Sequence, residues 1–295
     1  MTLSLNNLTF IIVTFKSEHI IYDCIESLPV NSNIIIVENS NNHELKEDLE
    51  KKYPKIKVVV QENIGMGAAN NRGIKLCKTD YAFVINPDVK FYKDTLDELI
   101  SFSLSTNDYS ILAPISDDLD YPNYKIKNKK IFNNEIDFLS VDAVDGFAML
   151  INKKKMNKIM NFKSQNYFDE NFFMYLENDD LCKRIKNTNE KIFIIPKAKI
   201  NHLGGKAVNS KYKKEIESSR NWHWIWSKFY FNKKHFGYRK AFIEGFPNFF
   251  SSIVKYIFYF LTNNKVKKIK YLNRASGFFN AALGKTSWYR PNINF

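Results

Sequence analysis

The first two-thirds of the chain alternates continuous apolar runs with polar or amphipathic segments. The runs LTFIIVTF, NIIIVEN, KVVVQEN and YAFVINPDV are rich in β-branched residues, and the segments between them, such as residues 17–28 and 42–52, suit helices. Continuous rather than alternating runs indicate strands that are buried on both faces, as in a parallel sheet. The pattern therefore predicts an α/β fold built from repeated strand–helix units.

Polar residues collect directly after these apolar runs. Thr14 follows the first run, Glu38 the second, Asn63 the third, and Asn86 with Asp88 the fourth. Ligands of open α/β sheets bind outside the carboxyl ends of the strands. We therefore expect a binding site at this edge of the sheet.

The segment ENIGMGAANNRGIK places Gly65 and Gly67 at a turn that leads into a predicted helix. The free N–H groups at the start of such a helix suit a phosphate. The glycine spacing is not the dinucleotide-binding fingerprint, and a tight turn between strand and helix would also require glycine.

Asp88, in INPDVKF, is the carboxylate that follows the fourth apolar run. A lone Asp after a strand can form a turn or cap a helix. It can also hold Mg²⁺ or Mn²⁺, because one or two carboxylates together with substrate phosphates and water complete the shell of such a cation. Its position at the same sheet edge as the glycine turn favours the metal.

The stretch FDENFFMYLENDDLCKRI combines acidic and aromatic residues and ends with bases. If residues 175–186 are helical, Glu177 and Asp180 share one face, Asp179 points elsewhere, and Cys182 and Ile185 face the sheet. Apolar neighbours raise the pKa of a carboxylate, which would suit a general base. A helix with acids at its start and bases at its end would show much of the same pattern for structural reasons.

The net charge of +13 lies almost entirely in the C-terminal third, where 18 Lys and Arg stand against 3 acids from Leu203 onward. The three cysteines match no metal or disulfide pattern, which favours a reducing compartment. The N-terminal apolar run reads as a buried strand rather than a signal peptide. These features predict a cytoplasmic protein.

Beyond residue 206, aromatic residues are mixed with Lys and Arg, and an apolar run over residues 246–261 precedes a basic cluster. The run is short for a membrane span and contains Lys255, so an interfacial helix on anionic lipid is expected. Helices packed on the catalytic domain or on a second subunit are the alternative. No nucleic-acid motif is present, and the acidic stretch would repel a phosphate backbone, so no nucleic-acid partner is expected.

Seven motifs together resemble one protein family. IIVTFKS, IVENSN, ENIGMGAANNRGI, INPDV, VDAVDGFAMLI, FDENFFMYLENDDLCKRI and KINHLGG occur in the order and rough spacing of the inverting family 2 glycosyltransferases. The chain looks most like the rhamnosyltransferase-like branch that builds bacterial surface polysaccharides. The resemblance covers about residues 8–205. It implies a GT-A fold, which is a Rossmann-like, mostly parallel sheet flanked by helices that binds a nucleotide-diphosphate sugar.

The resemblance also implies roles at the donor side. The family's metal motif appears as Asn86-Pro87-Asp88, so Asp88 is the charged ligand, and His202 matches a histidine that approaches the metal or the diphosphate. The expected metal is Mg²⁺ or Mn²⁺. The expected donor-binding residues are Thr14, Phe15, Glu38, Asn63, Gly65, Asn70, Asn86 and Asp88.

At the acceptor side, Asn178 stands where many relatives carry the catalytic Asp, and an amide cannot act as a general base. We expect Glu177 to be the base and Asp180 its orienting partner; Asp180 as base and an impaired enzyme are the alternatives. VDAVDGFAMLI is expected to line the acceptor pocket through Asp142, Asp145 and Gly146.

These inferences predict a metal-dependent inverting glycosyltransferase. Residues 1–205 would form the GT-A catalytic domain, and residues 206–295 a helical region that contacts the membrane surface or another copy of the chain in a homo-oligomer. The protein would work at the inner face of the cytoplasmic membrane, with a dTDP- or UDP-linked sugar as donor, rhamnose as first guess, and a glycan or lipid-linked acceptor. A non-catalytic binding or scaffold subunit is the alternative, because Asn86 and Asn178 stand where acids are common.

Overall fold

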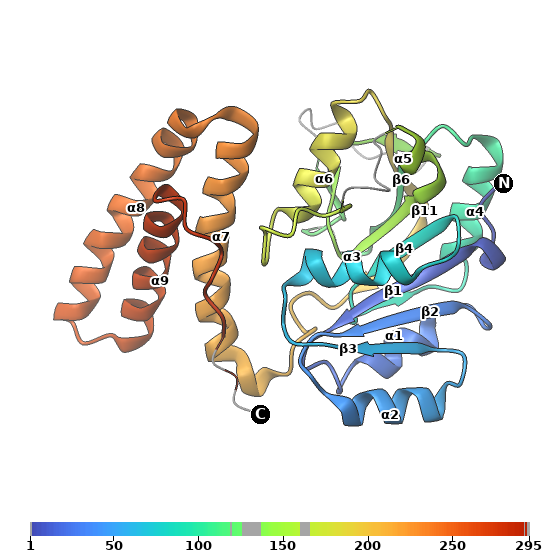
Figure 1. Cartoon of the computed structure of the whole chain (residues 1–295), viewed down its shortest axis with the longest axis horizontal. Coiled ribbons are helices and arrows are strands. Elements are labelled where there is room, and N and C mark those ends of the chain that lie inside the picture. The colour runs from blue at the N-terminus through green and yellow to red at the C-terminus, as the bar shows by residue number, and fades with distance from the viewer. Residues whose placement is uncertain (1, 119, 126–136, 160–165, 292, 294–295) are drawn as a thin grey trace. The chain divides into compact units, whose positions relative to one another are not determined.

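The computed structural model describes residues 2–118, 120–125, 137–159, 166–291 and 293. These residues form two compact units, and each is described separately (Figure 1). The α/β unit comprises Met1–Asp169 and Asn178–Asn209, and the helical unit comprises Glu170–Glu177 and Ser210–Phe295. The helical unit therefore takes in a short segment from the middle of the chain.

The α/β unit is built on a nine-stranded sheet in the described part of the chain, with strand order β3-β2-β1-β4-β10-β6-β11-β5 and with β8 paired to β11. A small second sheet pairs β7 with β9. The strands are β1 (Leu8–Thr14), β2 (Asn33–Glu38), β3 (Lys57–Val60), β4 (Tyr81–Ile85), β5 (Val89–Phe91), β6 (Ile111–Ser116), β7 (Tyr124–Lys125), β8 (Leu139–Ser140), β9 (Ala143–Val144), β10 (Ala148–Asn152) and β11 (Ile192–His202).

The four apolar runs form β1 to β4, which pair in parallel. β6 and β11 run in the same direction as these strands, whereas β5, β8 and β10 run in the opposite direction. The predicted mostly parallel α/β sheet is confirmed.

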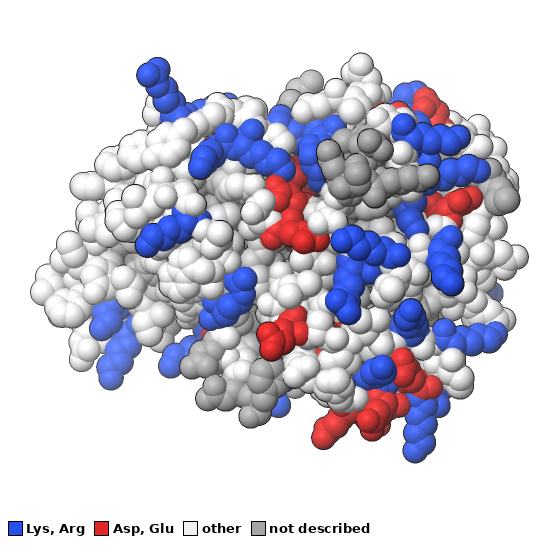
Figure 2. Space-filling view, in the orientation of Figure 1, with Lys and Arg blue, Asp and Glu red and all other residues white. Residues whose placement is uncertain are grey.

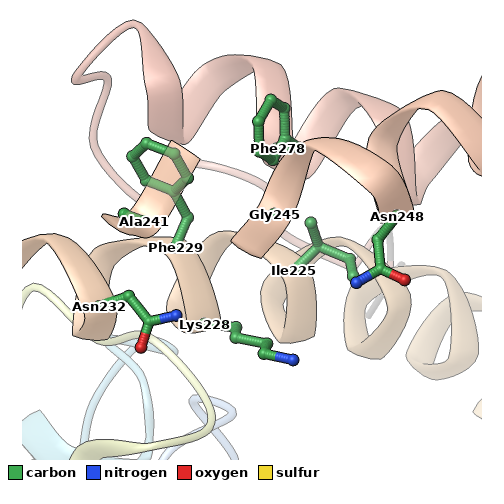
Figure 3. Close-up of a pocket in the computed structure, with 8 residues that line it drawn as sticks. All are labelled: Ile225, Lys228, Phe229, Asn232, Ala241, Gly245, Asn248 and Phe278. Atoms are coloured by element: carbon green, nitrogen blue, oxygen red, sulfur yellow. The ribbon is translucent and has the colours of Figure 1, made fainter. Parts of the chain in front are cut away.

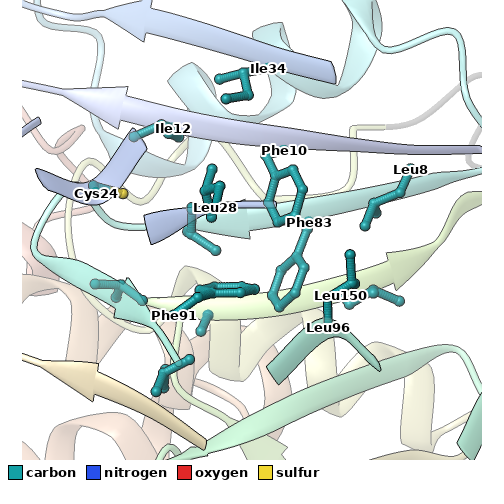
Figure 4. Packing of buried hydrophobic residues seen from close by; sticks show 14 of the residues in the cluster. Leu8, Phe10, Ile12, Cys24, Leu28, Ile34, Phe83, Phe91, Leu96 and Leu150 are labelled. Atoms are coloured by element: carbon teal, nitrogen blue, oxygen red, sulfur yellow. The ribbon is translucent and has the colours of Figure 1, made fainter. Parts of the chain in front are cut away.

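Alternate residues of β1 enter two separate cores. Phe10 and Ile12 pack with apolar side chains of α1, α2 and α4 on one face (Figure 4), whereas Ile11 and Val13 pack with α3, α5 and α6 on the other. Gly73 of α3 lies so close to Ile11 that an added Cβ would overlap its side chain. The helices of this unit are α1 (Ile21–Ser27), α2 (His43–Lys52), α3 (Met66–Leu76), α4 (Thr95–Ser105), α5 (Lys153–Ile159) and α6 (Glu177–Lys186).

Two predicted helices begin later than expected. α1 starts at Ile21 rather than near Ser17, whose backbone oxygen accepts hydrogen bonds from the N–H groups of Ile20 and Ile21. α6 starts at Glu177 rather than Tyr175, because Tyr175 and Leu176 have φ values of 72° and 68°, which no right-handed helix contains. Two consecutive non-glycine residues in this region store backbone strain directly before α6.

The helical unit consists of η2 (Ser210–Tyr212), α7 (Lys213–Phe236), α8 (Tyr238–Leu261), α9 (Lys265–Ala282) and the segment Glu170–Glu177. Gly277 of α9 lies against the backbone oxygen of Trp222 of α7, where a Cβ would collide. Among the described residues, no helix is both long and apolar enough to cross a membrane.

The segment from the middle of the chain contributes aromatic residues to the core of the helical unit. Phe172 packs edge-on against Tyr230, with ring centroids 4.9 Å apart, and Phe173 stacks on His223 at 4.6 Å. Ser227 of α7 donates a hydrogen bond to the backbone oxygen of Met174. Phe172 and Phe173 are fully buried, so their aromatic rings stabilise this unit rather than line an open pocket.

A pocket of about 270 Å³, counted with its opening to solvent, lies among the three long helices (Figure 3). Gly245 lies beside Phe278, whose ring would clash with an added Cβ, so α8 and α9 approach closely here. The pocket contains no carboxylate and therefore lacks the groups that sugar transfer needs. Its lining residues are Ile225, Lys228, Phe229, Asn232, Ala241, Gly245, Asn248 and Phe278.

Candidate active site

The predicted donor-side residues gather at the carboxyl ends of β1, β2 and β4. Thr14 and Glu38 are directly paired in the ladder between β1 and β2, and Asn86 follows the last residue of β4. All three strands are parallel, so their ends form one edge of the sheet. The predicted clustering of these polar residues is confirmed; their roles in binding stay predictions.

Glu38 is completely buried, and its carboxylate accepts several local hydrogen bonds. The backbone N–H groups of Ser40 and Asn42 donate to it at 3.1 Å and 2.6 Å, and the Ser40 hydroxyl donates at 2.5 Å. Burial raises the pKa of Glu38 above its ordinary value, and these hydrogen bonds oppose the shift. Glu38 thus shapes the loop after β2, and it is itself one of the predicted donor-binding residues.

Asn39 links the loops after β2 and β3, a role that no sequence motif indicates. Its side-chain oxygen accepts from Gln61 Nε2 at 2.9 Å and from the backbone N–H of Ile64, and its Nδ2 donates to Asn63 Oδ1 at 3.1 Å. Asn63 Oδ1 also accepts from the N–H of Gly65. The predicted donor residues Asn63 and Gly65 are therefore held in place, and Gly65 supplies the φ of 96° that the turn before α3 needs.

Three predicted donor-binding side chains carry buried oxygens that no described residue hydrogen-bonds. They are Thr14 Oγ1, Asn70 Oδ1 and Asp88 Oδ1. Buried polar atoms in native proteins nearly always have a partner, so these three atoms suit a ligand that supplies the missing bonds. Phe15, another predicted donor-binding residue, directly follows β1. It is partly buried, and its N–H donates to Ser17 Oγ.

Asp88, directly before β5, and His202, at the end of β11, lie together, because β5 and β11 are paired. His202 Nε2 is 3.6 Å from Asp88 Oδ1, and the side chains are 12% and 2% exposed, respectively. The His202 ring stacks on Phe147, with centroids 3.9 Å apart. The other Asp88 oxygen, Oδ2, accepts from the backbone N–H of Ala207 at 3.1 Å, so the carboxylate is fixed while Oδ1 stays available.

The segment after β11 folds back over this edge of the sheet. The N–H of Leu203 donates to the backbone oxygen of Asp88, and the N–H of Asn209 donates to that of Lys16. His19 Nε2 also lies 3.0 Å from the backbone oxygen of Lys206. These contacts bring the loops after β1, β4 and β11 together around Asp88.

The pair Asp88 and His202 fits a divalent cation that takes its remaining ligands from substrate and water. A carboxylate oxygen and an imidazole nitrogen are suitable donors, and Asp88 Oδ1 is buried with no hydrogen bond from the described chain. In the described ranges, no three His, Cys, Asp or Glu side chains cluster closely enough to hold a metal by themselves.

The three predicted acceptor-side residues lie around β9. Asp142 is half-buried, and its N–H donates to the backbone oxygen of Lys125 in β7. The Lys125 ammonium lies 3.5 Å from Asp145 Oδ1 and 2.8 Å from both oxygens of Asp179. Burial raises the pKa of Asp145, although the Lys125 charge opposes the shift. Lys125 was not predicted, since its partner Asp179 lies 54 residues away in sequence.

The acids at the start of α6 are held by separate partners. Asp180 is completely buried, and Arg184 Nε donates to its Oδ2 at 2.8 Å. The same guanidinium donates to the backbone oxygen of Tyr167. Asn178 Nδ2 donates to the backbone oxygen of Val144 at 2.8 Å. Glu177 is buried and belongs to the helical unit, so the structure does not place it relative to Asp88.

Cys182 and Ile185 of α6 are buried against the sheet, as predicted, together with Leu181. The start of the acidic stretch is fixed by Asn71 of α3, whose side chain donates to the backbone oxygen of Phe168 and accepts from its N–H. Nothing in the sequence marked Asn71, because the two residues lie 97 positions apart. Its amide fixes the chain where it enters the helical unit.

The chain matches a protein family in sequence and resembles a known structure in fold. The model of the family "Glycosyl transferase family 2" matches residues 9–185. The "Low-salt glycan biosynthesis hexosyltransferase Agl10" of Haloferax volcanii is 26% identical over 206 residues, which are 64% of this chain and 64% of that protein. The chain thus matches less than two-thirds of the length of this curated relative.

The crystal structure of S. aureus TarS 1-349 resembles this chain with a TM-score of 0.50 and 14% identity, over 96% of this chain and 93% of that one. At this identity the likeness concerns the fold, and it agrees with the predicted GT-A architecture. The family model covers more than half of the chain. The chain belongs to glycosyl transferase family 2.

Proposed function

We propose that this protein transfers a sugar from a nucleotide diphosphate to a glycan or lipid-linked acceptor, with inversion at the anomeric carbon. The observation that carries the proposal is the buried pair Asp88 and His202, in which Asp88 Oδ1 has no hydrogen bond from the described residues. Family membership supports the reaction class, and the relative Agl10 is named a hexosyltransferase of glycan biosynthesis.

The donor would lie along the carboxyl ends of β1, β2 and β4. Thr14, Phe15 and Glu38 would contact the nucleoside, and Asn63, Gly65 and Asn70 the ribose or diphosphate at the start of α3. Family 2 enzymes commonly use divalent metals, and here Asp88 and His202 would hold Mg²⁺ or Mn²⁺, with Asn86 beside them. The bound cation would neutralise charge on the leaving diphosphate.

The acceptor would approach from the side of β9, where Asp142, Asp145 and Gly146 lie. Glu177 is the base predicted from the sequence, and Asp180 is its orienting partner. The ion pair with Arg184 suits Asp180 to a positioning role, because the guanidinium stabilises its charged form and makes it a poor acceptor of a proton.

Donor identity follows from the branch resemblance alone. dTDP-rhamnose is our first choice of donor and a UDP-linked sugar the second, and a bacterial surface polysaccharide or its lipid-linked precursor is the acceptor class. The cognate nucleotide sugar is expected to raise the melting temperature in the presence of Mn²⁺. At a ligand concentration about 100 times Kd, binding stabilises the native state by about 2.7 kcal/mol.

Thermal shift with a panel of dTDP-, UDP- and GDP-linked sugars would measure this stabilisation, with EDTA as the control. A panel in which no nucleotide sugar shifts the melting temperature would contradict the proposal. A donor that binds without ever being transferred would favour the non-catalytic alternative, which Asn86 and Asn178 make reasonable.

The surface of α8 and α9 supports an association with the inner membrane face. Ile243, Phe250 and Leu261 are 71%, 61% and 76% exposed. At the left of Figure 2 this surface is mostly uncharged, with separate Lys and Arg side chains. α8 and α9 contain a single acid, Glu244. An apolar face bordered by cations fits an anionic lipid surface.

Aromatic rings hold several of these cations at the end of the α8–α9 hairpin. Lys267 Nζ lies 5.0 Å from the Tyr259 ring centroid, and Lys268 Nζ lies 5.3 Å from that of Phe260. Aromatic rings next to basic groups suit the boundary between headgroups and acyl chains.

Replacing Lys267 and Lys268 with Gln is expected to weaken binding to vesicles of phosphatidylglycerol and phosphatidylcholine at least about tenfold, because each cation near an anionic surface contributes about 1 kcal/mol. Flotation across a salt series would measure this loss. The matched control replaces Lys51 and Lys75 of the α/β unit with Gln. Three results would each contradict the proposal. They are wild-type binding to vesicles of phosphatidylcholine alone that equals binding to the anionic vesicles, a dimer that forms without vesicles, and nucleic-acid binding without lipid binding.

A further inference from the structure

Asn178 has a structural task that explains why it is an amide. Its Nδ2 donates to the backbone oxygen of Val144 at 2.8 Å, which ties α6 to β9. A carboxylate at this position would place an oxygen against that carbonyl, and the two would repel each other. The side chain of Asn178 also packs on Gly146, where an added Cβ would lie 3.5 Å from Asn178 Cβ. Asn178 therefore connects α6 to β9 through this hydrogen bond, and it cannot act as the general base.

The two acids that follow Asn178 in α6, Asp179 and Asp180, are each paired with a basic side chain. Asp180 is fully buried in its ion pair with Arg184. Both oxygens of Asp179 accept from Lys125 at 2.8 Å. Asp180 is therefore closed to a substrate hydroxyl, and Asp179 is occupied by the Lys125 ammonium.

Asp145 lies between the two features that define the site. The residue before it, Val144, accepts the hydrogen bond from Asn178, and the residue two positions after it, Phe147, stacks on His202. The backbone oxygen of Phe147 also accepts from the N–H of Asn86 at 2.9 Å, directly beside Asp88. The Asp145 side chain is therefore carried on a segment fixed at both ends, next to the proposed metal ligands.

The carboxylate of Asp145 is also accessible. Its side chain is 27% exposed, whereas that of Asp180 is 0% exposed. Lys125 lies 3.5 Å from Asp145 but 2.8 Å from Asp179. Asp179 is thus the closer partner of the ammonium, and Asp145 is the more exposed of the two carboxylates, at 27% against 15%.

We propose that Asp145 supplies the general base that Asn178 does not. The inference rests on the proposed glycosyl transfer and assigns the base to Asp145 in place of Glu177. Asp145 takes the proton of the acceptor hydroxyl while the hydroxyl oxygen forms a bond to the anomeric carbon of the donor sugar. The bond between that carbon and the diphosphate oxygen breaks, and its electron pair leaves with the nucleoside diphosphate. Asp179 acts through Lys125 and is a positioning residue.

The test compares D145N with D179N and E177Q. The donor is the nucleotide sugar that stabilises the wild type, and the acceptors are octyl glycosides of glucose, galactose and N-acetylglucosamine. D145N is expected to lower kcat at least about 100-fold, the usual range for loss of a general base. Its thermal shift with the donor should equal that of the wild type. The loss of kcat in E177Q should be smaller than that in D145N, and the effect of D179N should fall mainly on the acceptor KM.

D145N with kcat above about a tenth of the wild-type value would overturn the inference, as would loss of transfer in E177Q with normal donor binding. The substitution D145N is nearly isosteric and leaves Lys125 paired with Asp179, so the variant should fold. A wild-type protein that binds no nucleotide sugar would overturn the proposed function itself and the inference with it. Donor binding by the wild type thus distinguishes failure of the proposed function from failure of the inference about Asp145.

Discussion

Replacing Asp88 with asparagine is expected to lower sugar transfer at least about 1,000-fold, the largest effect of any substitution proposed for this protein. Asp88 is the single acid in Asn86-Pro87-Asp88. An amide keeps the shape and can still accept from the N–H of Ala207, but it removes the negative charge that holds a divalent cation beside His202. The loss should be measured as kcat/KM across a Mn²⁺ titration.

Two further variants make this prediction specific. Asp94→Asn removes an exposed acid that makes no side-chain cap at the start of α4, and it should transfer sugar like the wild type. Asn86→Asp restores the second acid of the family's metal motif and should lower the Mn²⁺ concentration needed for half-maximal rate. Normal transfer by D88N at limiting Mn²⁺ would exclude Asp88 as the charged ligand.

Acidification is expected to destabilise the helical unit through His223. This side chain is completely buried, with Nδ1 2.9 Å from Ser287 Oγ and Nε2 2.7 Å from the backbone oxygen of Tyr289. The pKa of His223 is lowered from 6.5 to about 4, mainly by burial and also by the nearby Arg290, while the hydrogen bond with Tyr289 opposes the shift. Between these two values the unfolded chain binds a proton that the folded chain does not, so stability falls as the pH drops from about 6.5 to about 4. The loss should approach about 3 kcal/mol.

All four tryptophans, Trp222, Trp224, Trp226 and Trp288, belong to the helical unit, so fluorescence excited selectively at tryptophan reports the unfolding of this unit. Denaturant unfolding should be followed from pH 7.5 to 4 for the wild type and for His223→Gln, which cannot titrate. The free energy of unfolding is plotted against pH for both proteins. The difference between the two slopes gives the contribution of His223, because the carboxylates contribute equally to both. His43→Gln, which removes an exposed histidine, should keep the wild-type slope. Equal slopes for the wild type and H223Q would refute the assignment.

Local pattern was enough to predict the sheet and the edge at which the candidate site lies. Continuous β-branched runs are typical of strands that are buried on both faces. The polar residue that follows each run must lie at the end of that strand, because it is next in the sequence. Thr14 and Glu38 are therefore side by side, as expected. The antiparallel β10, which inserts between β4 and β6, was not predicted, because its pairing depends on contacts far apart in sequence.

The partners of the acidic stretch could not be predicted for the same reason. Lys125, Asn71 and Val144 lie between 34 and 97 residues from the groups that they contact. The helix start was also misplaced, since helical spacing gave no sign of the left-handed backbone at Tyr175 and Leu176. The sequence did show that Asn178 was unusual. The structure adds that its amide donates to the backbone oxygen of Val144.

The route of the chain through the two units has a consequence for how this protein can be cut or recombined. The polypeptide leaves the α/β unit after Asp169, returns at Asn178 and leaves again after Asn209. A truncation near residue 205 would remove α7 and leave Phe172 and Phe173 without the helix that buries them. The C-terminal region is therefore not a detachable module: a gene fusion, domain exchange or minimal catalytic fragment has to retain both units or redesign residues 170–177.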